Sequence, residues 1–195
     1  MTPPEVLNYL FLRTMPSRTI DYDYGMGLLD MTDEYDRMER AYFANEFTEA
    51  EENNVSAYVI AQHNHVPAQL PMQISYRHLV NVVQMTKDFD GVLEVLGRTE
   101  DMSKATDADL KRLKVRVDCI KFWLNGFAPE NVKFSIQESI PADIEITDVE
   151  KDYFKTLKGK LEAGEWNADA INAAVTEAAQ GVIGITVPMN MSMAK

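Results

Sequence analysis

Apolar residues recur at helical spacing along most of this 195-residue chain. The first such segment covers residues 4–13, where proline and glutamate suit the first turn of a helix and Pro16 follows as a stop signal. A second helix is predicted from about residue 26 to residue 43, with acidic side chains opposite its apolar stripe. The two stripes consist of Val6, Leu7, Leu10 and Phe11, and of Leu28, Met31, Tyr35, Met38 and Tyr42.

The same period predicts further helices after residue 75, and capping residues mark several of their starts. The predicted ranges are 76–87, 89–96, 107–125, 148–163 and about 167–180. Ser75, Thr106 and Asn167 are the candidate N-caps. Together with the first two segments, these ranges predict a mainly α fold.

Four stretches lack a clear helical period. Residues 45–54 are polar and acidic, which indicates a loop or a short helical turn. Residues 55–62 are rich in β-branched and apolar side chains, so a short strand is predicted there, with a buried helix of similar length as the alternative. Residues 63–71 are predicted to form a loop, and residues 131–136 an extended segment.

The helix predicted over residues 107–125 has an unusual pattern. Leu113, Val117 and Ile120 fall on one face of the helical wheel, while Val115 and Phe122 fall nearly opposite. A helix that is apolar on two sides is expected to lie between two layers of the structure.

Composition narrows the classes of function. No window approaches the roughly 20 apolar residues of a membrane span, and no signal peptide is recognisable, so we expect a cytoplasmic protein. Cys119 is the only cysteine, which excludes an internal disulfide. The net charge of −12 argues against indiscriminate binding to polyanions, but residues 76–121 carry nine basic and eight acidic side chains. A bound polyanion would therefore be expected in this middle part.

The sequence contains none of the motifs of a self-contained nucleotide-using or hydrolytic enzyme. No phosphate loop, nucleophile elbow or HExxH motif is present. His63 and His65 could approach a metal, but a zinc site needs at least one further ligand, and the reading as a solvated loop is favoured. We predict neither a catalytic residue nor a metal ligand in this chain.

A cluster of basic residues follows the margins of the helix predicted at 107–125. The cluster comprises Lys111, Arg112, Lys114, Arg116 and Lys121. These side chains could track a phosphate backbone, with Phe122 or Trp123 as a stacking surface for bases. The competing interpretation, that they snorkel along a core helix, is favoured on the residues alone.

Three stretches carry a family resemblance, in the order in which that family has them. They are PPEVLNYLFLRTMPSRTIDYDYGMGLLDMTDEYDRMERAYF from residue 3, YRHLVNVVQ from residue 76, and WLNGFAPENVKF with the basic helix before it. On these residues, about 3–136, the chain resembles the region that follows the catalytic domain in class I lysyl-tRNA synthetases. Nothing like that family's HIGH and KMSKS signatures is present.

The resemblance implies a fold and a division of the chain. Residues 1–70 would form a stem-contact (SC-fold) helical domain. Residues 71–195 would form an α-helix cage similar to the anticodon-binding region of glutamyl-tRNA synthetases. The parent enzyme would use ATP and Mg²⁺ to attach lysine to its tRNA, whereas this chain would need no cofactor and would bind lysine tRNA without catalysing the reaction.

Charge and placement suggest which residues would contact the RNA. Arg13 and Arg18 flank the break between the first two helices and are candidates for stem phosphates. The candidates for the anticodon arm are Arg77, Lys87, Lys111, Arg112 and Arg116. We expect neither DNA nor a membrane as a partner. The alternative is an acidic helical module that binds a protein or dimerises without binding RNA.

Overall fold

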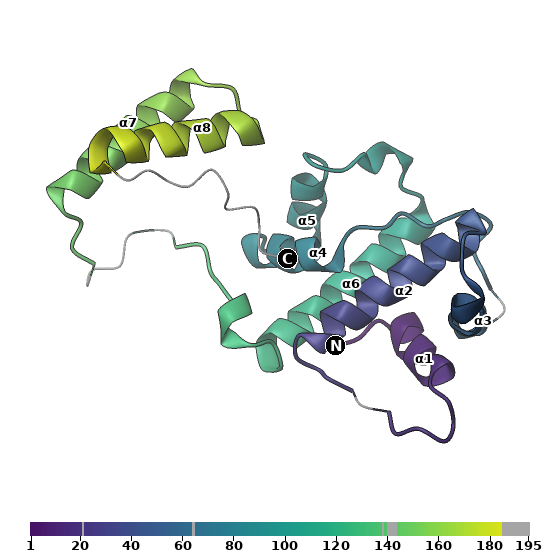
Figure 1. Ribbon diagram of the computed structural model, residues 1–195. Coiled ribbons are helices and arrows are strands. Elements are labelled where there is room, and N and C mark those ends of the chain that lie inside the picture. The colour runs from purple at the N-terminus through teal and green to yellow at the C-terminus, as the bar shows by residue number, and fades with distance from the viewer. Residues whose placement is uncertain (21, 64, 138, 140–143, 185–195) are drawn as a thin grey trace. The chain divides into compact units, whose positions relative to one another are not determined.

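The computed structural model describes residues 1–20, 22–63, 65–137, 139 and 144–184, and these residues form helices and irregular connections (Figure 1). The mainly α fold is confirmed, and the described residues contain no strand. The α-helices are α1 Pro4–Arg13, α2 Gly27–Ala44, α3 Glu52–Ala61, α4 Tyr76–Met85, α5 Phe89–Leu96, α6 Asp107–Gly126, α7 Asp148–Ala163 and α8 Ala168–Ala178. Short 3₁₀ turns cover Glu49–Glu51, Met102–Lys104 and Glu130–Val132, and a π turn covers Ala179–Ile183. None of the described helices is long and apolar enough to cross a membrane.

The chain divides into two compact units, Met1–Ile136 and Gln137–Lys195. In the first unit, α1, α2, α3, α4 and α6 contribute to one hydrophobic core. Its largest fully buried side chains include Trp123, Tyr9, Tyr35, Tyr58 and Tyr76. In the described part of the second unit, α7 and α8 pack on each other. The predicted division into two domains at residue 70 stays a prediction. In this structure, side chains from before and after residue 70 contribute to the same core.

Residues 55–61 lie in helix α3, so the predicted strand is wrong and the alternative, a buried helix, is confirmed. A capping box starts the segment, because the Thr48 side chain and the Glu51 carboxylate satisfy each other's backbone N–H groups. Val55, Tyr58 and Ala61 are buried at intervals of three residues. α3 packs against α1 and α2, and this contact explains why an apolar, β-branched run adopts the helix.

Helix α6 has one buried face rather than the two that were predicted. Leu113, Val117 and Ile120 are buried, as expected. On the opposite side, however, the side chains of Val115 and Phe122 are 42% and 57% exposed. The helix therefore does not lie between two layers of the described structure, because nothing in it covers this second apolar face.

Side-chain hydrogen bonds fix both ends of α6. At its start, the Thr106 hydroxyl accepts from the Asp109 amide at 3.2 Å, while the Asp109 carboxylate accepts from the Thr106 amide at 2.9 Å. Near its end, the buried Trp123 ring donates from Nε1 to the carbonyl of Tyr24 at 2.7 Å. This bond ties α6 to the segment that precedes α2.

The remaining predictions concern two helix caps and two stretches without a helical period. Asn167 caps α8 as predicted, accepting from the Ala170 amide at 2.8 Å, whereas Ser75 precedes α4 without a side-chain capping bond. A 3₁₀ turn at Glu130–Val132 takes part of the stretch predicted to be extended. In the sequence IPADIEIT from residue 140, apolar and polar residues alternate, and residues 140–143 of it lie outside the described residues.

The two tryptophans offer a test of the burial described for the two units, because each unit contains one of them. Trp123 is fully buried in the first unit, and Trp166 is 79% exposed in the second. In a Trp166→Phe variant, urea unfolding should therefore shift the tryptophan emission strongly to longer wavelength. A Trp123→Phe variant should show little shift, since its remaining tryptophan is already solvated. A large shift from Trp166 would contradict the exposure seen for it.

Candidate nucleic-acid interface

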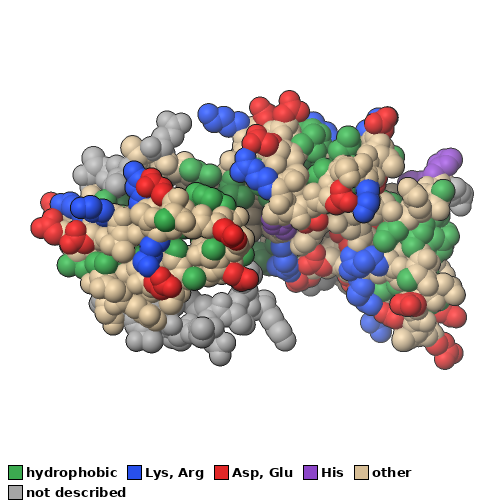
Figure 2. Space-filling model, turned by 90° about the horizontal axis from the view of Figure 1, so that it is seen from above, with side chains coloured by type: hydrophobic (Ala, Val, Ile, Leu, Met, Phe, Trp, Pro, Cys, Tyr) green, Lys and Arg blue, Asp and Glu red, His purple; other side chains and the backbone are tan. Residues whose placement is uncertain are grey.

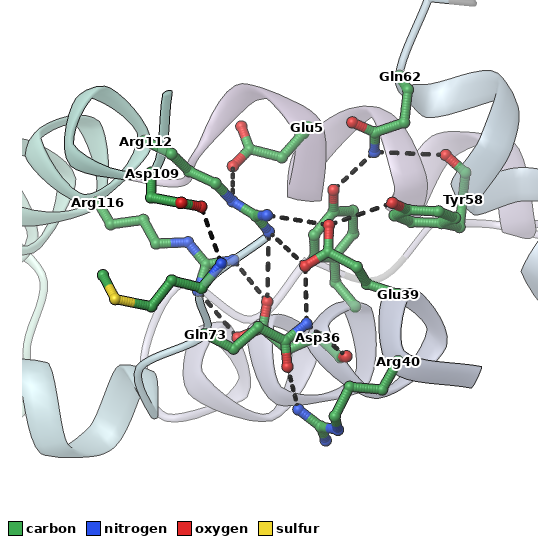
Figure 3. A network of polar contacts seen from close by, with 12 residues as sticks. Glu5, Asp36, Glu39, Arg40, Tyr58, Gln62, Gln73, Asp109, Arg112 and Arg116 are labelled. Carbon is green, nitrogen blue, oxygen red and sulfur yellow. Dashed lines mark hydrogen bonds and ion pairs between the residues drawn. The ribbon is translucent and has the colours of Figure 1, made fainter. Parts of the chain in front are cut away.

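The basic helix α6 faces the acidic helix α2 through two buried ion pairs (Figure 3). Arg116 is 4% exposed and donates from Nη1 to Asp36 Oδ2 at 2.9 Å and from Nη2 to Asp36 Oδ1 at 2.5 Å. Arg112 donates from Nη1 and Nη2 to the two oxygens of Glu39 at 3.0 and 2.9 Å. Asp36 and Glu39 are three residues apart, and Arg112 and Arg116 are four apart, so each pair lies on one face of its helix.

Glu39 is fully buried, and its charge is compensated completely. Besides the two bonds from Arg112, its carboxylate accepts from the Tyr58 hydroxyl at 3.2 Å and from Gln73 Nε2 at 2.7 Å. Gln73 also donates to the Asp36 carbonyl at 3.0 Å and accepts a hydrogen bond from Arg40. These contacts link α2, α3, α6 and the segment before α4 into one network (Figure 3).

The electrostatics of the network favour the charged forms of its arginines. Burial alone would lower the pKa of Arg116, but its hydrogen bonds and attraction to Asp36 raise it. Burial and the neighbouring Arg116 charge likewise lower the pKa of Arg112, and the bonds with Glu39 more than offset this. Burial next to Glu39 raises the pKa of the Tyr58 phenol, so this group stays a protonated donor.

This geometry changes the interpretation of two predicted RNA contacts. The terminal nitrogens of Arg112 and Arg116 donate to carboxylates inside the core, and a buried charge that loses its partner is costly. The arrangement supports a structural role for both residues, close to the interpretation of α6 as a core helix. It does not support using their guanidinium groups for phosphates.

Two other candidates, Arg13 and Arg77, form ion pairs at the surface. Arg13 pairs with Glu34 and lies over the Tyr9 ring at 5.6 Å. Arg77 pairs with Asp30 and Asp33, the latter at 3.0 Å between Nε and Oδ2, and its side chain is 43% exposed. The exposed pairs of Arg77 contribute little net free energy, so a phosphate can replace either carboxylate at small cost. The Arg13–Glu34 pair is partly buried, with side chains 30% and 26% exposed.

The last three candidates, Arg18, Lys87 and Lys111, are exposed and have no carboxylate partner among the described residues. Arg18 lines a shallow hollow of about 290 Å³ together with Arg13 and Asn54. The structure therefore brings the two predicted stem-phosphate contacts to one place. On the face drawn in Figure 2, Lys and Arg side chains lie interspersed with Asp and Glu, without a large area of basic residues alone.

An aromatic cluster lies at the C-terminal end of α6. The rings of Phe122 and Phe127 are stacked, with centroids 5.8 Å apart and an interplanar angle of 28°. Tyr24 meets Phe127 edge-on at 5.7 Å, and all three side chains are exposed. Of the two stacking residues considered from the sequence, Phe122 is thus accessible and Trp123 is not. The contribution of Phe127 and Tyr24 was missed, because it depends on a contact across about 100 residues.

The two histidines of the loop after α3 do not form a metal site with other described residues. His63 lies 3.0 Å from Asn8 through Nε2 and Nδ2, respectively. No group of three or more His, Cys, Asp or Glu side chains is placed to hold a metal within the part of the chain that the structure describes.

Comparison with known proteins first indicates the class of protein that the chain resembles. Residues 1–64 match the family model of class I tRNA synthetases specific for K, the one-letter code for lysine. This match covers the first of the three stretches on which the resemblance rests.

The similar proteins are lysine–tRNA ligases. The chain is 32% identical to that of Thermococcus kodakarensis over 189 residues, and 30% identical to that of Thermoplasma acidophilum over 181 residues; each alignment covers 91% of this chain. A third relative, from Methanosphaera stadtmanae, is 31% identical over 85% of this chain. The chain spans about a third of the length of these relatives. The resemblance to class I lysyl-tRNA synthetases is therefore confirmed.

The buried pairs lead to a prediction about stability. Arg116→Ala should lower the free energy of unfolding by about 3–5 kcal/mol, because it leaves Asp36 buried without its partner. Urea denaturation of the intact chain measures this change. As a control, Arg98→Ala removes an exposed pair with Glu94 and should cost less than about 1 kcal/mol.

One double variant separates a charge effect from a packing effect. Replacing both partners, Asp36→Leu with Arg116→Met, should be less destabilising than Arg116→Ala alone, because no unpaired charge remains in the core. If Arg116→Ala is as mild as Arg98→Ala, the pair is not the constraint described here.

Proposed function

We propose that this chain is the tRNA-binding portion of a lysine–tRNA ligase, a cytoplasmic enzyme that uses ATP and Mg²⁺ to attach lysine to its tRNA. The observation that carries the proposal is the similarity to lysine–tRNA ligases over about nine-tenths of this chain. In this proposal, residues 1–70 form the stem-contact domain and residues 71–195 the helical cage for the anticodon. The mainly α structure is consistent with both assignments.

The proposal assigns binding, not chemistry, to this chain. Its sequence contains none of the phosphate-binding motifs or class I signatures described above, and the described residues offer no clustered metal ligands. We therefore derive no step of the aminoacylation reaction from it. The expected activity of the chain by itself is recognition of lysine tRNA without esterification.

The available cations suggest how an acidic chain would hold an RNA backbone. Arg18, Lys87 and Lys111 would contact phosphates directly, because none of them forms an ion pair with a described carboxylate that would have to break first. Arg13 would join Arg18 at their shared hollow by exchanging Glu34 for a phosphate. Each contact releases a counterion, so the affinity should fall steeply as the salt concentration rises.

Unpaired bases require a different surface. Sequence-specific recognition of RNA relies on bases that are splayed out, stacked on aromatic rings and hydrogen-bonded at their edges. The exposed cluster of Tyr24, Phe122 and Phe127 has the chemistry of a stacking platform. It lies on the first unit, whose core is independent of α7 and α8.

Binding of lysine tRNA at several salt concentrations tests this proposal. Arg18→Ala should weaken binding and reduce the slope of log K against log salt concentration by about 1, because one phosphate contact is lost. Arg98→Ala is the matched control: it removes the same charge from an exposed residue to which the proposal assigns no phosphate contact, and it should leave the slope nearly unchanged.

The results that would contradict the proposal are specific. Equal affinity for an unrelated tRNA would remove the claim of specificity. Absence of tRNA binding even at low salt, together with stable self-association or a protein partner, would favour the acidic interaction module instead.

A further inference from the structure

A pocket of about 600 Å³ lies within the first unit, apart from the aromatic cluster and the hollow at Arg18. It is lined by residues of α1 and α6, by Tyr35 of α2, and by the segment that follows α3. Its volume lies within the range of roughly 300–1,000 Å³ that is typical of small-molecule sites. Because Glu5 lines it, we call it the Glu5 pocket.

The walls of the Glu5 pocket suit a flat, partly apolar ring. Three prolines, Pro4, Pro67 and Pro71, line it together with Leu70 and Val115. Proline rings restrict the backbone and present rigid apolar surfaces. A planar heteroaromatic group could pack its faces against these walls and keep its polar edge for hydrogen bonds.

Most polar groups of the pocket are already engaged within the protein. Asp109 accepts hydrogen bonds from the amides of Met72 and Thr106, and the terminal nitrogens of Arg112 are held by Glu39. The Tyr35 hydroxyl accepts from Gln62 Nε2 at 2.6 Å. These groups shape the pocket but have little hydrogen-bonding capacity left for a ligand.

Glu5, Lys111 and the exposed Gln69 are the exceptions among the described lining residues. Glu5 Oε1 is buried 3.7 Å from Arg112 Nε, and neither atom has a hydrogen-bond partner (Figure 3). No hydrogen bond from the described residues reaches the other oxygen of Glu5 either, so the carboxylate keeps its acceptor capacity. Lys111 is exposed and has no ion-pair partner among the described residues. The pocket thus combines a half-buried acceptor with an accessible cation.

This combination defines the ligand. An ionised carboxylate only accepts hydrogen bonds, so it selects a ring edge that carries N–H donors. Among the common bases, guanine presents a ring N–H beside an amino group, and both donors can converge on Glu5 Oε2, since Oε1 is buried. Adenine and cytosine present an amino group alone, and uracil presents one N–H between two carbonyl oxygens that a carboxylate repels. A phosphate on the same ligand would suit Lys111.

We propose that the Glu5 pocket binds one guanine nucleotide, with the base between the apolar walls, Glu5 accepting from its donor edge, and Lys111 near its phosphate. The nucleotide is either an unpaired residue of a bound RNA or a free nucleotide. Only the first of these alternatives, an unpaired residue of a bound RNA, rests on the proposed function.

Titration of the intact chain with GMP, AMP, CMP and UMP tests the pocket without RNA. The affinity should be highest for GMP and lowest for UMP. Glu5→Gln should weaken GMP binding by about tenfold or more and remove the preference for it, since one acceptor becomes a donor. Lys111→Ala should weaken all four ligands to a similar degree. Glu52→Gln, which changes an exposed carboxylate on α3, is the matched control and should leave binding unchanged.

Urea denaturation of each variant separates a change in binding from a change in folding. When a variant unfolds at a urea concentration close to that of the wild type, its binding data can be compared directly. The proposal would then be overturned if the chain showed no preference for GMP, or if Glu5→Gln and Glu52→Gln bound GMP equally well. If the Glu5→Gln variant unfolds more easily, Lys111→Ala and the ranking of the four nucleotides on the wild-type chain still decide it.

Lysine tRNA binding then distinguishes the two sources. Weaker binding of the RNA to Glu5→Gln than to Glu52→Gln identifies the ligand as a base of the RNA. Unchanged RNA binding together with a GMP preference identifies a free nucleotide. If no RNA binds to any variant, the proposed function fails, while the GMP titration still tests the pocket by itself.

Discussion

The first unit of this protein depends on the contact between an acidic and a basic helix across its core. Two carboxylates of α2, Asp36 and Glu39, each receive two hydrogen bonds from an arginine of α6. Buried charges are costly unless they are paired and further hydrogen bonds support the pair. Here Tyr58 and Gln73 complete that requirement for Glu39, which draws α3 and the segment before α4 into the same network.

This constraint also determines what remains for function. A basic helix suggests binding to a polyanion, yet the two most deeply placed arginines of α6 compensate charges inside the protein. Cations that can meet an RNA backbone therefore lie elsewhere: on the connection after α1, between α4 and α5, and at the exposed margin of α6. Under the proposed function, such dispersed contacts would hold each phosphate locally without a broad positive surface.

The Glu5 pocket adjoins the network and shows how a structural ion pair can support a binding site. Arg112 is held by Glu39 on one side, and on the other it lies within ion-pair distance of Glu5. A cation held in place next to Glu5 limits the movement of that side chain. The side chain that would select a ligand thus lies beside an arginine whose two terminal nitrogens both bond to Glu39.

The sequence by itself determined the helices with clear apolar periodicity, such as α1, α5 and α7, and the family to which the chain is similar. Periodicity and caps act within a few residues, so no distant contact is needed to recognise them. Only the tertiary structure decided that residues 55–61 are helical, that one face of α6 is exposed, and which cations are buried. The basic residues of α6 look alike in the sequence; their difference arises from α2, some 80 residues away, whose carboxylates meet Arg112 and Arg116 but not Lys111.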